Sequence, residues 1–477
     1  MCLDLRCGDQ TTCAYDPVSQ VTNILHQLTA TSTPINQAAY LYSPVGNRTQ
    51  LTDRRGTQTF GYDNLDRLTS ASHPLLATPQ AFAYDPVGNR TTGGSVVNSG
   101  NQLTADAIHS YQYDDNGNLT RKTLLATGNF TAYTYDAENR LTKVEDFVAG
   151  NPTPAFTSTY RYDGLGRRIE KVAGGQTKRY VYDGEDILLE YDGANVLQAR
   201  YTHGPGIDEP IAVTKGGSTF FYHQDGLGTV TDLTDSTGVT AKSYSYDAYG
   251  NIVEQTGTVE QPYTYTGREF DQDTGLYYYR ARYYDATTGR FLQQDPLKLG
   301  GGSVNLYGYV LNSPANFIDP SGLFLERVFC GPRNSYSNMS ISAEEFVEHV
   351  GSRSLRDLQY EYGSSNAPES EAGGPHPKKR YVRDPADPNS VIDMRHFLVV
   401  GKQGELFGLG VEIGQALSSN PDARSSAFDP QDFYSNALGA NFFASADPSQ
   451  NFRDQLRRFF AKRKHVACPL DPVNSCK

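Results

Sequence analysis

The sequence has no tryptophan and only three methionines in 477 residues, and no apolar run approaches the length of a membrane-spanning helix. Its first ten residues, MCLDLRCGDQ, lack the apolar centre of a secretory signal. We therefore expect no transmembrane segment and no signal peptide. The 33 tyrosines, 45 glycines and 25 prolines instead favour short strands and many turns. A chain of this length exceeds one compact core, so two or more units are expected.

The sequence has only six cysteines, and none lies between residues 14 and 329. The six cysteines are Cys2, Cys7, Cys13, Cys330, Cys468 and Cys476. There is no C-x-x-C or H-E-x-x-H pattern, which argues against a zinc site. A disulfide from Cys330 to Cys468 or Cys476 is compatible with an oxidising compartment. A glycine run at 408–414 follows no Rossmann-type strand, so we reject a dinucleotide site and expect no cofactor and no metal.

Charge is distributed unevenly along the chain. The net charge is −12; residues 1–323 hold 24 basic against 35 acidic side chains, and residues 324–477 hold 18 against 19. The acidic first part argues against general nucleic-acid binding by that part, whereas the tail can hold local basic patches.

Tyr-Asp pairs recur through the first half of the chain, each followed by turn residues. The copies are Tyr62-Asp63, Tyr84-Asp85, Tyr113-Asp114, Tyr135-Asp136, Tyr162-Asp163, Tyr182-Asp183 and Tyr246-Asp247, with Tyr42-Ser43 as a degenerate first copy. Most spacings are about 20 to 29 residues, which indicates a repeat architecture in which each unit buries its apolar face against its neighbours.

One repeat has the pattern of a β-hairpin. Large and polar residues alternate before each Tyr, the Asp side chain can start a turn, and Gly88, Gly117 or Gly166 can supply a positive φ. Consecutive hairpins should pair into one long antiparallel sheet. We interpret the Tyr-Asp pairs as scaffold; the alternative makes the aromatic rows a carbohydrate-binding surface.

The block LYYYRARYYD…FIDPSGL, which ends at Leu323, differs from the sequence on either side. It holds Asp295-Pro296 and Asp319-Pro320 around a Gly- and Tyr-rich middle. It closely resembles the core segment of the Rhs (YD-repeat) family of polymorphic toxins. The resemblance implies a mainly β YD-repeat hairpin sheet spiralling toward a partial cocoon over residues 1–270, a self-cleaving core plug over 271–323, and a separate variable toxin domain over 324–477.

The resemblance also assigns roles to single residues. Arg282, Asp295 and Asp319 occupy the positions of the family's essential arginine and aspartate pair, and the cut falls between Leu323 and Phe324. Two carboxylates held together share a proton, so one can act as base toward a water while the other polarises the scissile carbonyl. The alternative is that both Asp-Pro pairs only end strands.

Expectations about partners and location follow from the same resemblance. The repeat array is shorter than family shells usually are, so either another polypeptide completes the shell or the chain is a truncated orphan cassette. A toxin of this kind is made in the bacterial cytoplasm, is delivered to target cells by a secretion machinery in interbacterial competition, and is matched by a cognate immunity protein. The alternative function is a non-toxic, adhesive, carbohydrate-binding cell-surface protein.

Helix signals begin after Leu323 and predict a helix-rich α or α+β tail. A capping box at 342–345 opens an amphipathic pattern that runs to Val350, and a second short pattern covers 353–360. Residues 452–464 predict a basic amphipathic helix. Residues 364–390, rich in Ser, Pro, Gly and charge, predict a mobile loop.

The tail also holds a candidate hydrolytic site. In one interpretation His396 is a general base oriented by Asp393, its neighbour if this stretch is helical, and Glu412, Asp432 or Ser435 completes the site. In the other interpretation His396 is a satisfied core histidine and Asp432 is a helix cap.

Overall fold

A computed structural model of the chain describes residues 4–5, 9–17, 20–204, 206–298, 303–323, 326–327, 347, 381–384, 387–393 and 452–462. The chain divides into two units, Met1–Val328 with Pro469–Lys477, and Phe329–Cys468. Strands predominate among the described residues, which confirms the predicted β class.

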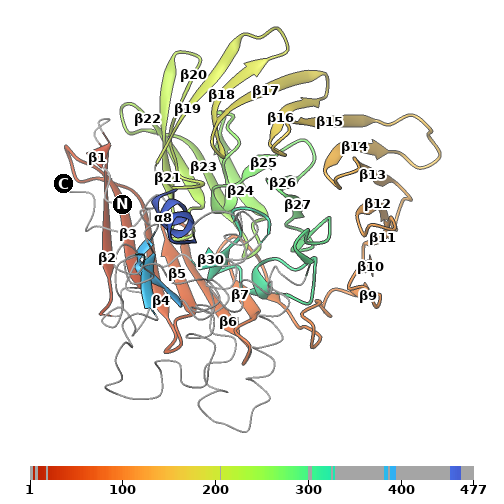
Figure 1. Ribbon diagram of the computed structural model, residues 1–477, viewed down its shortest axis with the longest axis horizontal. Coiled ribbons are helices and arrows are strands. Elements are labelled where there is room, and N and C mark those ends of the chain that lie inside the picture. Colours follow the sequence, from red (N-terminus) through yellow and green to blue (C-terminus); the bar gives the residue numbers. More distant parts are fainter. Residues whose placement is uncertain are drawn as a thin grey trace. The chain divides into compact units, whose positions relative to one another are not determined.

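Two large antiparallel sheets make up most of the first unit, with strands hydrogen-bonded in sequence order (Figure 1). The first sheet contains β1 (Asp4–Leu5), β2 (Asp9–Tyr15), β3 (Val21–Leu28), β4 (Pro34–Tyr42), β5 (Arg48–Asp53), β6 (Gly56–Tyr62), β7 (Leu68–Ser72) and β8 (Gln80–Ala81). The second sheet contains β9 (Val96–Val97), β10 (Leu103–Ala105), β11 (His109–Tyr113), β12 (Leu119–Leu124), β13 (Phe130–Tyr135), β14 (Leu141–Phe147), β15 (Phe156–Tyr162), β16 (Arg168–Ala173), β17 (Gln176–Asp183), β18 (Asp186–Asp192), β19 (Leu197–His203), β20 (Pro210–Lys215), β21 (Ser218–Gln224), β22 (Val230–Asp235), β23 (Thr240–Tyr246) and β24 (Ile252–Gly257). Such pairing of sequence neighbours is what a chain of hairpins produces, but the division between β8 and β9 gives two sheets where one long sheet was predicted.

In most of the Tyr-Asp pairs the Asp closes the turn that follows its strand; Asp183 is an exception, because it is the last residue of β17. Asp85 Oδ1 accepts hydrogen bonds from the backbone N–H of Val87 at 3.0 Å and of Asn89 at 2.8 Å. Gly88 adopts a φ of 84° in this turn, a region that glycine enters without steric cost. The same pair of backbone bonds forms at Asp63, Asp114, Asp136, Asp163, Asp225 and Asp247. The predicted hairpin turn is therefore confirmed.

The Tyr of each pair ties its hairpin to the preceding one through its hydroxyl. Tyr135 Oη donates to the carbonyl of Leu119 at 2.8 Å, and Tyr246 Oη donates to that of Val230 at 2.8 Å. Equivalent bonds join Tyr42 to Val21, Tyr62 to Arg48, Tyr84 to Leu68, Tyr162 to Leu141 and Tyr182 to Arg168. These tyrosines hold the sheet together, as the scaffold interpretation requires.

A small four-stranded sheet, called the plug here, packs against the second sheet. It contains β25 (Glu269–Asp271), β26 (Leu276–Tyr279), β27 (Arg282–Asp285) and β28 (Arg290–Phe291). β26 is buried on both faces: Tyr277 and Tyr279 belong to one apolar cluster with residues of β17–β23, while Leu276 and Tyr278 belong to another with residues of β10–β15. The alternation follows from the two-residue period of a strand. After β28 come the 3-10 turn η3 (Val310–Asn312) and the pair β29 (Phe317–Ile318) and β30 (Glu326–Arg327); the 3-10 turn η1 (Tyr265–Gly267) precedes β25.

The described part of the second unit contains a hairpin and a helix. β31 (Tyr381–Asp384) pairs antiparallel with β32 (Asp387–Asp393). This hairpin corrects the prediction of a mobile loop over 364–390 at the end of that segment, because aromatic and β-branched residues on both sides of the turn favour strands. The helix α8 (Phe452–Lys462) lies where a basic amphipathic helix was predicted, and its Leu456 is buried.

A helix-rich character of residues 324–477 is not confirmed. α8 is accompanied by strands in the described residues of the tail. The helices expected at 342–350 and 353–360 lie outside the described residues, apart from the single helical position Val347.

Candidate functional site

Three separate parts of the core block bring the predicted self-cleavage residues together. Arg282 is the first residue of β27, Asp295 lies in the loop after β28, and Asp319 directly follows β29. All three are buried, with 3%, 6% and 3% of their surfaces exposed. The hairpin β26–β27 presents Arg282, and both Asp-Pro loops reach it with their carboxylates.

The guanidinium of Arg282 contacts both carboxylates. Its Nη2 lies 3.0 Å from Asp295 Oδ2 and 3.3 Å from Asp319 Oδ2. Its Nη1 donates to the carbonyl of Leu306 at 3.2 Å, and the carbon of the guanidinium lies 3.7 Å from the centre of the Phe291 ring. The arginine is thus held on several sides, and both acids share one donor atom.

Each carboxylate is fixed by the turn that its own Asp-Pro dipeptide makes. Asp295 Oδ1 accepts from the N–H of Leu297 at 2.8 Å, and the Asp295 N–H donates to Leu306 at 2.8 Å. Asp319 Oδ1 accepts from the N–H of Leu323 at 3.0 Å. Both Asp-Pro dipeptides thus lie in turns, and the turn of Asp319 brings its carboxylate to the residue that precedes the predicted cut.

Burial dominates the protonation of the two acids. It raises the pKa of Asp319 to about 6, although the nearby Arg282 opposes the shift. Burial also raises the pKa of Asp295, again against Arg282. Two neighbouring carboxyl groups, of which one keeps its proton and the other is ionised, can act as acid and base.

A small cavity of about 20 Å³ opens between these residues. Its walls include Arg282, both aspartates and Leu323. A volume of about 10–15 Å³ on this measure holds one water molecule. The site can therefore accommodate one water in a cavity lined by the two aspartates and Leu323.

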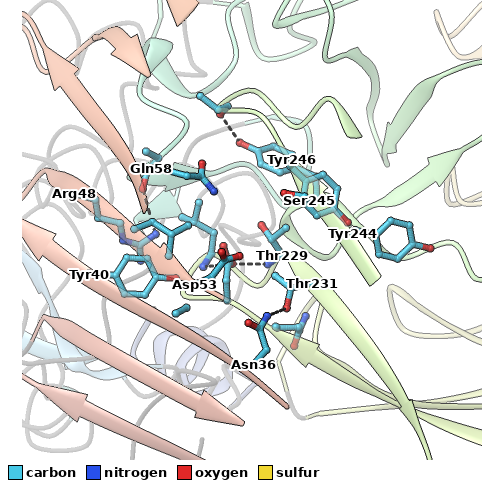
Figure 2. Close-up of a pocket in the computed structure, with 18 of the residues that line it drawn as sticks. Asn36, Tyr40, Arg48, Asp53, Gln58, Thr229, Thr231, Tyr244, Ser245 and Tyr246 are labelled. Atoms are coloured by element: carbon cyan, nitrogen blue, oxygen red, sulfur yellow. Dashed lines mark hydrogen bonds between the residues drawn. The ribbon is translucent and has the colours of Figure 1, made fainter. Parts of the chain in front are cut away.

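A larger cavity lies elsewhere in the first unit, at the seam between the first and second sheets (Figure 2). It has a volume of about 70 Å³. Asn36 and Arg48 come from the first sheet and Thr231 and Tyr246 from the second, and Asn36 donates to Thr231 at 2.9 Å across the seam. None of the predicted cleavage residues lines it. In the part of the chain that the structure describes, no group of three His, Cys, Asp or Glu side chains is arranged to hold a metal ion.

The predicted tail site is not brought together among the described residues. Asp393 is the last residue of strand β32, so it does not begin a helix with His396 as a neighbour. His396, Glu412, Asp432 and Ser435 lie outside the described residues, as does Phe324. No described helix is long and apolar enough to cross a membrane.

Sequence reasoning missed part of the site. Arg280 donates a hydrogen bond to the carbonyl of Pro320, and Gly322 accepts one from Arg282 Nε. The signal was present in the spacing Arg-Ala-Arg, which places two arginines on either side of a hairpin tip. The spacing does not indicate that this tip contacts the loop at residues 320–322.

The chain resembles known proteins over just more than half of its length. The family model described as teneurin YD-shell matches residues 45–309. The tRNA nuclease WapA of Bacillus subtilis is 35% identical over 280 residues, covering 55% of this chain and 12% of that protein. Double-stranded DNA deaminase toxin A of Burkholderia cenocepacia is 31% identical over 325 residues, covering 60% of this chain and 22% of that protein.

Two further likenesses are weaker. Toxin protein Tse5 of Pseudomonas aeruginosa is 28% identical over 367 residues, covering 62% of this chain and 27% of that protein. The matching chain in the crystal structure of TcdB2-TccC3 has 20% sequence identity and a TM-score of 0.48. The match covers 66% of this chain and 19% of the matching chain. The chain thus spans between 12% and 27% of the length of these three curated relatives.

Proposed function

The chain belongs to the YD-shell family of Rhs/YD-repeat polymorphic toxins, and from that premise we propose that it cuts its own backbone once. The cut lies between Leu323 and Phe324 and frees a toxic tail from the β-sheet carrier. The observation that carries the proposal is the contact of one buried guanidinium with two buried carboxylates, one of which also binds the Leu323 N–H.

The proposed reaction is hydrolysis of one peptide bond. Asp295 takes a proton from a water whose oxygen attacks the carbonyl carbon of Leu323. Asp319, whose pKa burial raises to about 6, keeps its proton and hydrogen-bonds the carbonyl oxygen as negative charge develops there. The C–N bond then breaks, the nitrogen of Phe324 receives the proton from Asp295, and Leu323 ends in a carboxylate.

Arg282 has a positioning role in this scheme. Its Nη2 holds the two carboxylates at 3.0 and 3.3 Å, and its Nε holds the carbonyl of Gly322 next to the attacked residue. Because the substrate is part of the same chain, proximity supplies much of the rate, and a single turnover is sufficient.

Electrophoresis of the purified full-length protein tests the cut. Wild type should give a fragment of about 17 kDa, the share of 154 residues in a 52.5 kDa chain of 477. Asp295→Asn and Asp319→Asn should leave the chain intact, whereas Asp273→Asn, on a half-exposed acid of the plug, should cleave like wild type. An intact wild-type chain would reject self-cleavage.

For the tail we propose toxicity without assigning a substrate. The relatives are named for different targets, tRNA in one case and double-stranded DNA in another, although each resembles this chain. We also propose that a secretion machinery delivers the protein to target cells. The producing cell would make a cognate immunity protein. Expression of residues 324–477 in a bacterial cytosol should arrest growth, and normal growth with folded protein would count against a toxin.

A hydrolase-like site at His396 is the part of the tail proposal that a single substitution tests. His396→Ala should abolish growth arrest while the tail keeps its circular dichroism spectrum; retained toxicity would remove His396 from the site. A carbohydrate-binding role gains no support, because the hydroxyls of the Tyr-Asp pairs bind backbone carbonyls of neighbouring hairpins.

A further inference from the structure

The tip of the β26–β27 hairpin holds three successive carbonyls of the loop that leads to the proposed cut. Arg280 Nη1 donates to the carbonyl of Pro320, the Ala281 N–H donates to that of Ser321 at 3.2 Å, and Arg282 Nε donates to that of Gly322. Residues 280, 281 and 282 thus match residues 320, 321 and 322 one to one. The next carbonyl along the chain is that of Leu323, the one that the proposed reaction attacks.

Arg280 is itself anchored to the second sheet. Its Nη2 lies 2.8 Å from Asp208 Oδ1 and its Nη1 lies 3.2 Å from Asp208 Oδ2, a two-pronged contact in which both ions are largely buried. Asp208 lies in the connection between β19 and β20, and it also pairs with Arg268. Two-pronged contacts between arginine and carboxylate fix geometry as well as charge. The nitrogen that touches Pro320 therefore has a set position relative to the sheet.

The loop fits against the hairpin tip with no room to slide. Gly322 has a φ of 71°, and a Cβ at this position would lie 2.2 Å from the carbonyl oxygen of Tyr279 and 3.3 Å from the nitrogen of Arg282. Arg280 also adopts a positive φ, 57°, which is uncommon for a residue with a side chain. A shift by one residue would put a side chain where only glycine fits.

We propose that Arg280 is a positioning residue that sets the register of the cut. Held by Asp208, it fixes the carbonyl of Pro320, so that the third carbonyl beyond it, that of Leu323, faces the two acids. This inference rests on the proposed self-cleavage. It adds that the bond is selected by contacts outside the acidic pair and that the second sheet must be folded onto the plug before the cut can occur.

The test measures the half-life of the intact full-length chain after cell-free synthesis is stopped. Mass spectrometry then identifies the N-terminus of each new fragment. Arg280→Ala should lengthen the half-life of the intact chain by about tenfold or more and give fragments with more than one N-terminus, because the reacting carbonyl loses its fixed position. Asp208→Asn should act in the same direction. Arg280→Lys, which keeps a cation beside Asp208, should restore part of the rate and the single N-terminus at Phe324.

Arg55→Lys is the matched control. The Arg55 side chain is 7% exposed, close to the 14% of Arg280, and its contacts are with Asp53, Thr231 and Asp232, not with residues 320–323. This variant should cut at Phe324 with a half-life within about twofold of wild type, since proximity at the cut is unchanged.

The outcomes separate the two proposals. Wild type that remains intact rejects self-cleavage itself. Wild type that cuts, together with an Arg280→Ala chain that cuts equally fast at Phe324 alone, rejects the positioning role. If Arg280→Ala is insoluble, Arg280→Lys and Asp208→Asn decide. Slower cleavage, or fragments with more than one N-terminus, in either variant supports the positioning role. Cleavage at the wild-type rate with a single N-terminus in both variants rejects it.

Discussion

Asp319 is the buried group whose ionisation matters most to the proposed reaction. It contacts Arg282 through one oxygen and the Leu323 N–H through the other. Burial favours its neutral form, while the single guanidinium is shared with Asp295 and compensates only in part. The protonation state of Asp319 therefore determines at which pH the site can react.

The rate of self-cleavage should depend on pH with a maximum below neutrality. Asp319, with a raised pKa of about 6, is protonated below that pH and loses the required proton above it. Above pH 6 the rate should fall by about tenfold per unit. At low pH it should also fall, once Asp295 takes up a proton. Measured half-lives of the intact chain between pH 4 and 8 check this, and a rate that rises from pH 6 to 8 would contradict the assignment.

Gly322→Ala should slow self-cleavage strongly. The added methyl group would overlap the carbonyl oxygen of Tyr279 and force the loop away from Arg282. Gly166→Ala is the control, because Gly166 also has a positive φ, 83°, but has open space around its Cβ position. The control should lose about 1 kcal/mol of unfolding free energy and keep the wild-type rate of cleavage. Equal rates in both variants would show that the close contact at Gly322 is unimportant.

At the scale of the element, the repeat is a hairpin with two built-in connections. The Asp side chain satisfies backbone N–H groups within its own turn, and the Tyr hydroxyl satisfies a carbonyl of the preceding hairpin 14 to 21 residues earlier. The first connection is local and the second joins neighbours. Together they explain why this dipeptide recurs and why the sheet grows in sequence order.

Removal of a connecting hydroxyl should weaken the sheet measurably. Tyr246→Phe leaves the carbonyl of Val230 without its donor in a buried place and should lower the free energy of unfolding by about 1 kcal/mol. Tyr222, in the same apolar cluster, has a buried hydroxyl with no hydrogen-bond partner among the described residues. Tyr222→Phe should thus be neutral or slightly stabilising. Urea unfolding of both variants checks this, and equal losses would contradict the role of the hydroxyl.

At the scale of the whole first unit, buried charges connect the second sheet to the plug. Arg168 of β16 lies 2.8 Å from Glu269 and contacts Asp271, both in β25, and Lys171 lies 3.1 Å from Asp271. Ions taken from water are costly unless they are paired, so these contacts require one arrangement of sheet and plug. A misplaced plug would leave several buried charges unpaired.

The adjacent residues Arg167 and Arg168 should respond very differently to truncation. Arg168→Ala leaves Asp271 and Glu269 buried with less compensation and should cost about 3–5 kcal/mol of unfolding free energy. Arg167 pairs with Asp163 at 2.8 Å near the surface, and Arg167→Ala should cost about 0.2–1 kcal/mol. Chemical denaturation of the two variants measures the difference. Similar losses would mean that the buried pairs do not join sheet and plug.

Much of the fold could be predicted because it depends on local interactions. The turn at Asp85 and Gly88 needs only residues within five positions, and the spacing of the copies implies the order of the hairpins. The candidate site was also accessible through the resemblance, as Arg282, Asp295 and Asp319 all lie in one recognisable block. The hairpin at 381–393 was missed because polar and Pro-rich neighbours concealed two short strands.

The repeated hairpin follows from the order of amino acids alone, since an Asp side chain and a glycine specify a turn whatever surrounds them. Which copies face the interior depends on tertiary packing: at the same turn position Leu165 is 79% exposed and Tyr249 is 1% exposed. Tertiary packing alone also brings Arg280 to Pro320 and Asp208, which lie 40 and 72 positions away. Contacts over such separations depend on how sheet and plug pack, and packing leaves no periodic pattern in the sequence.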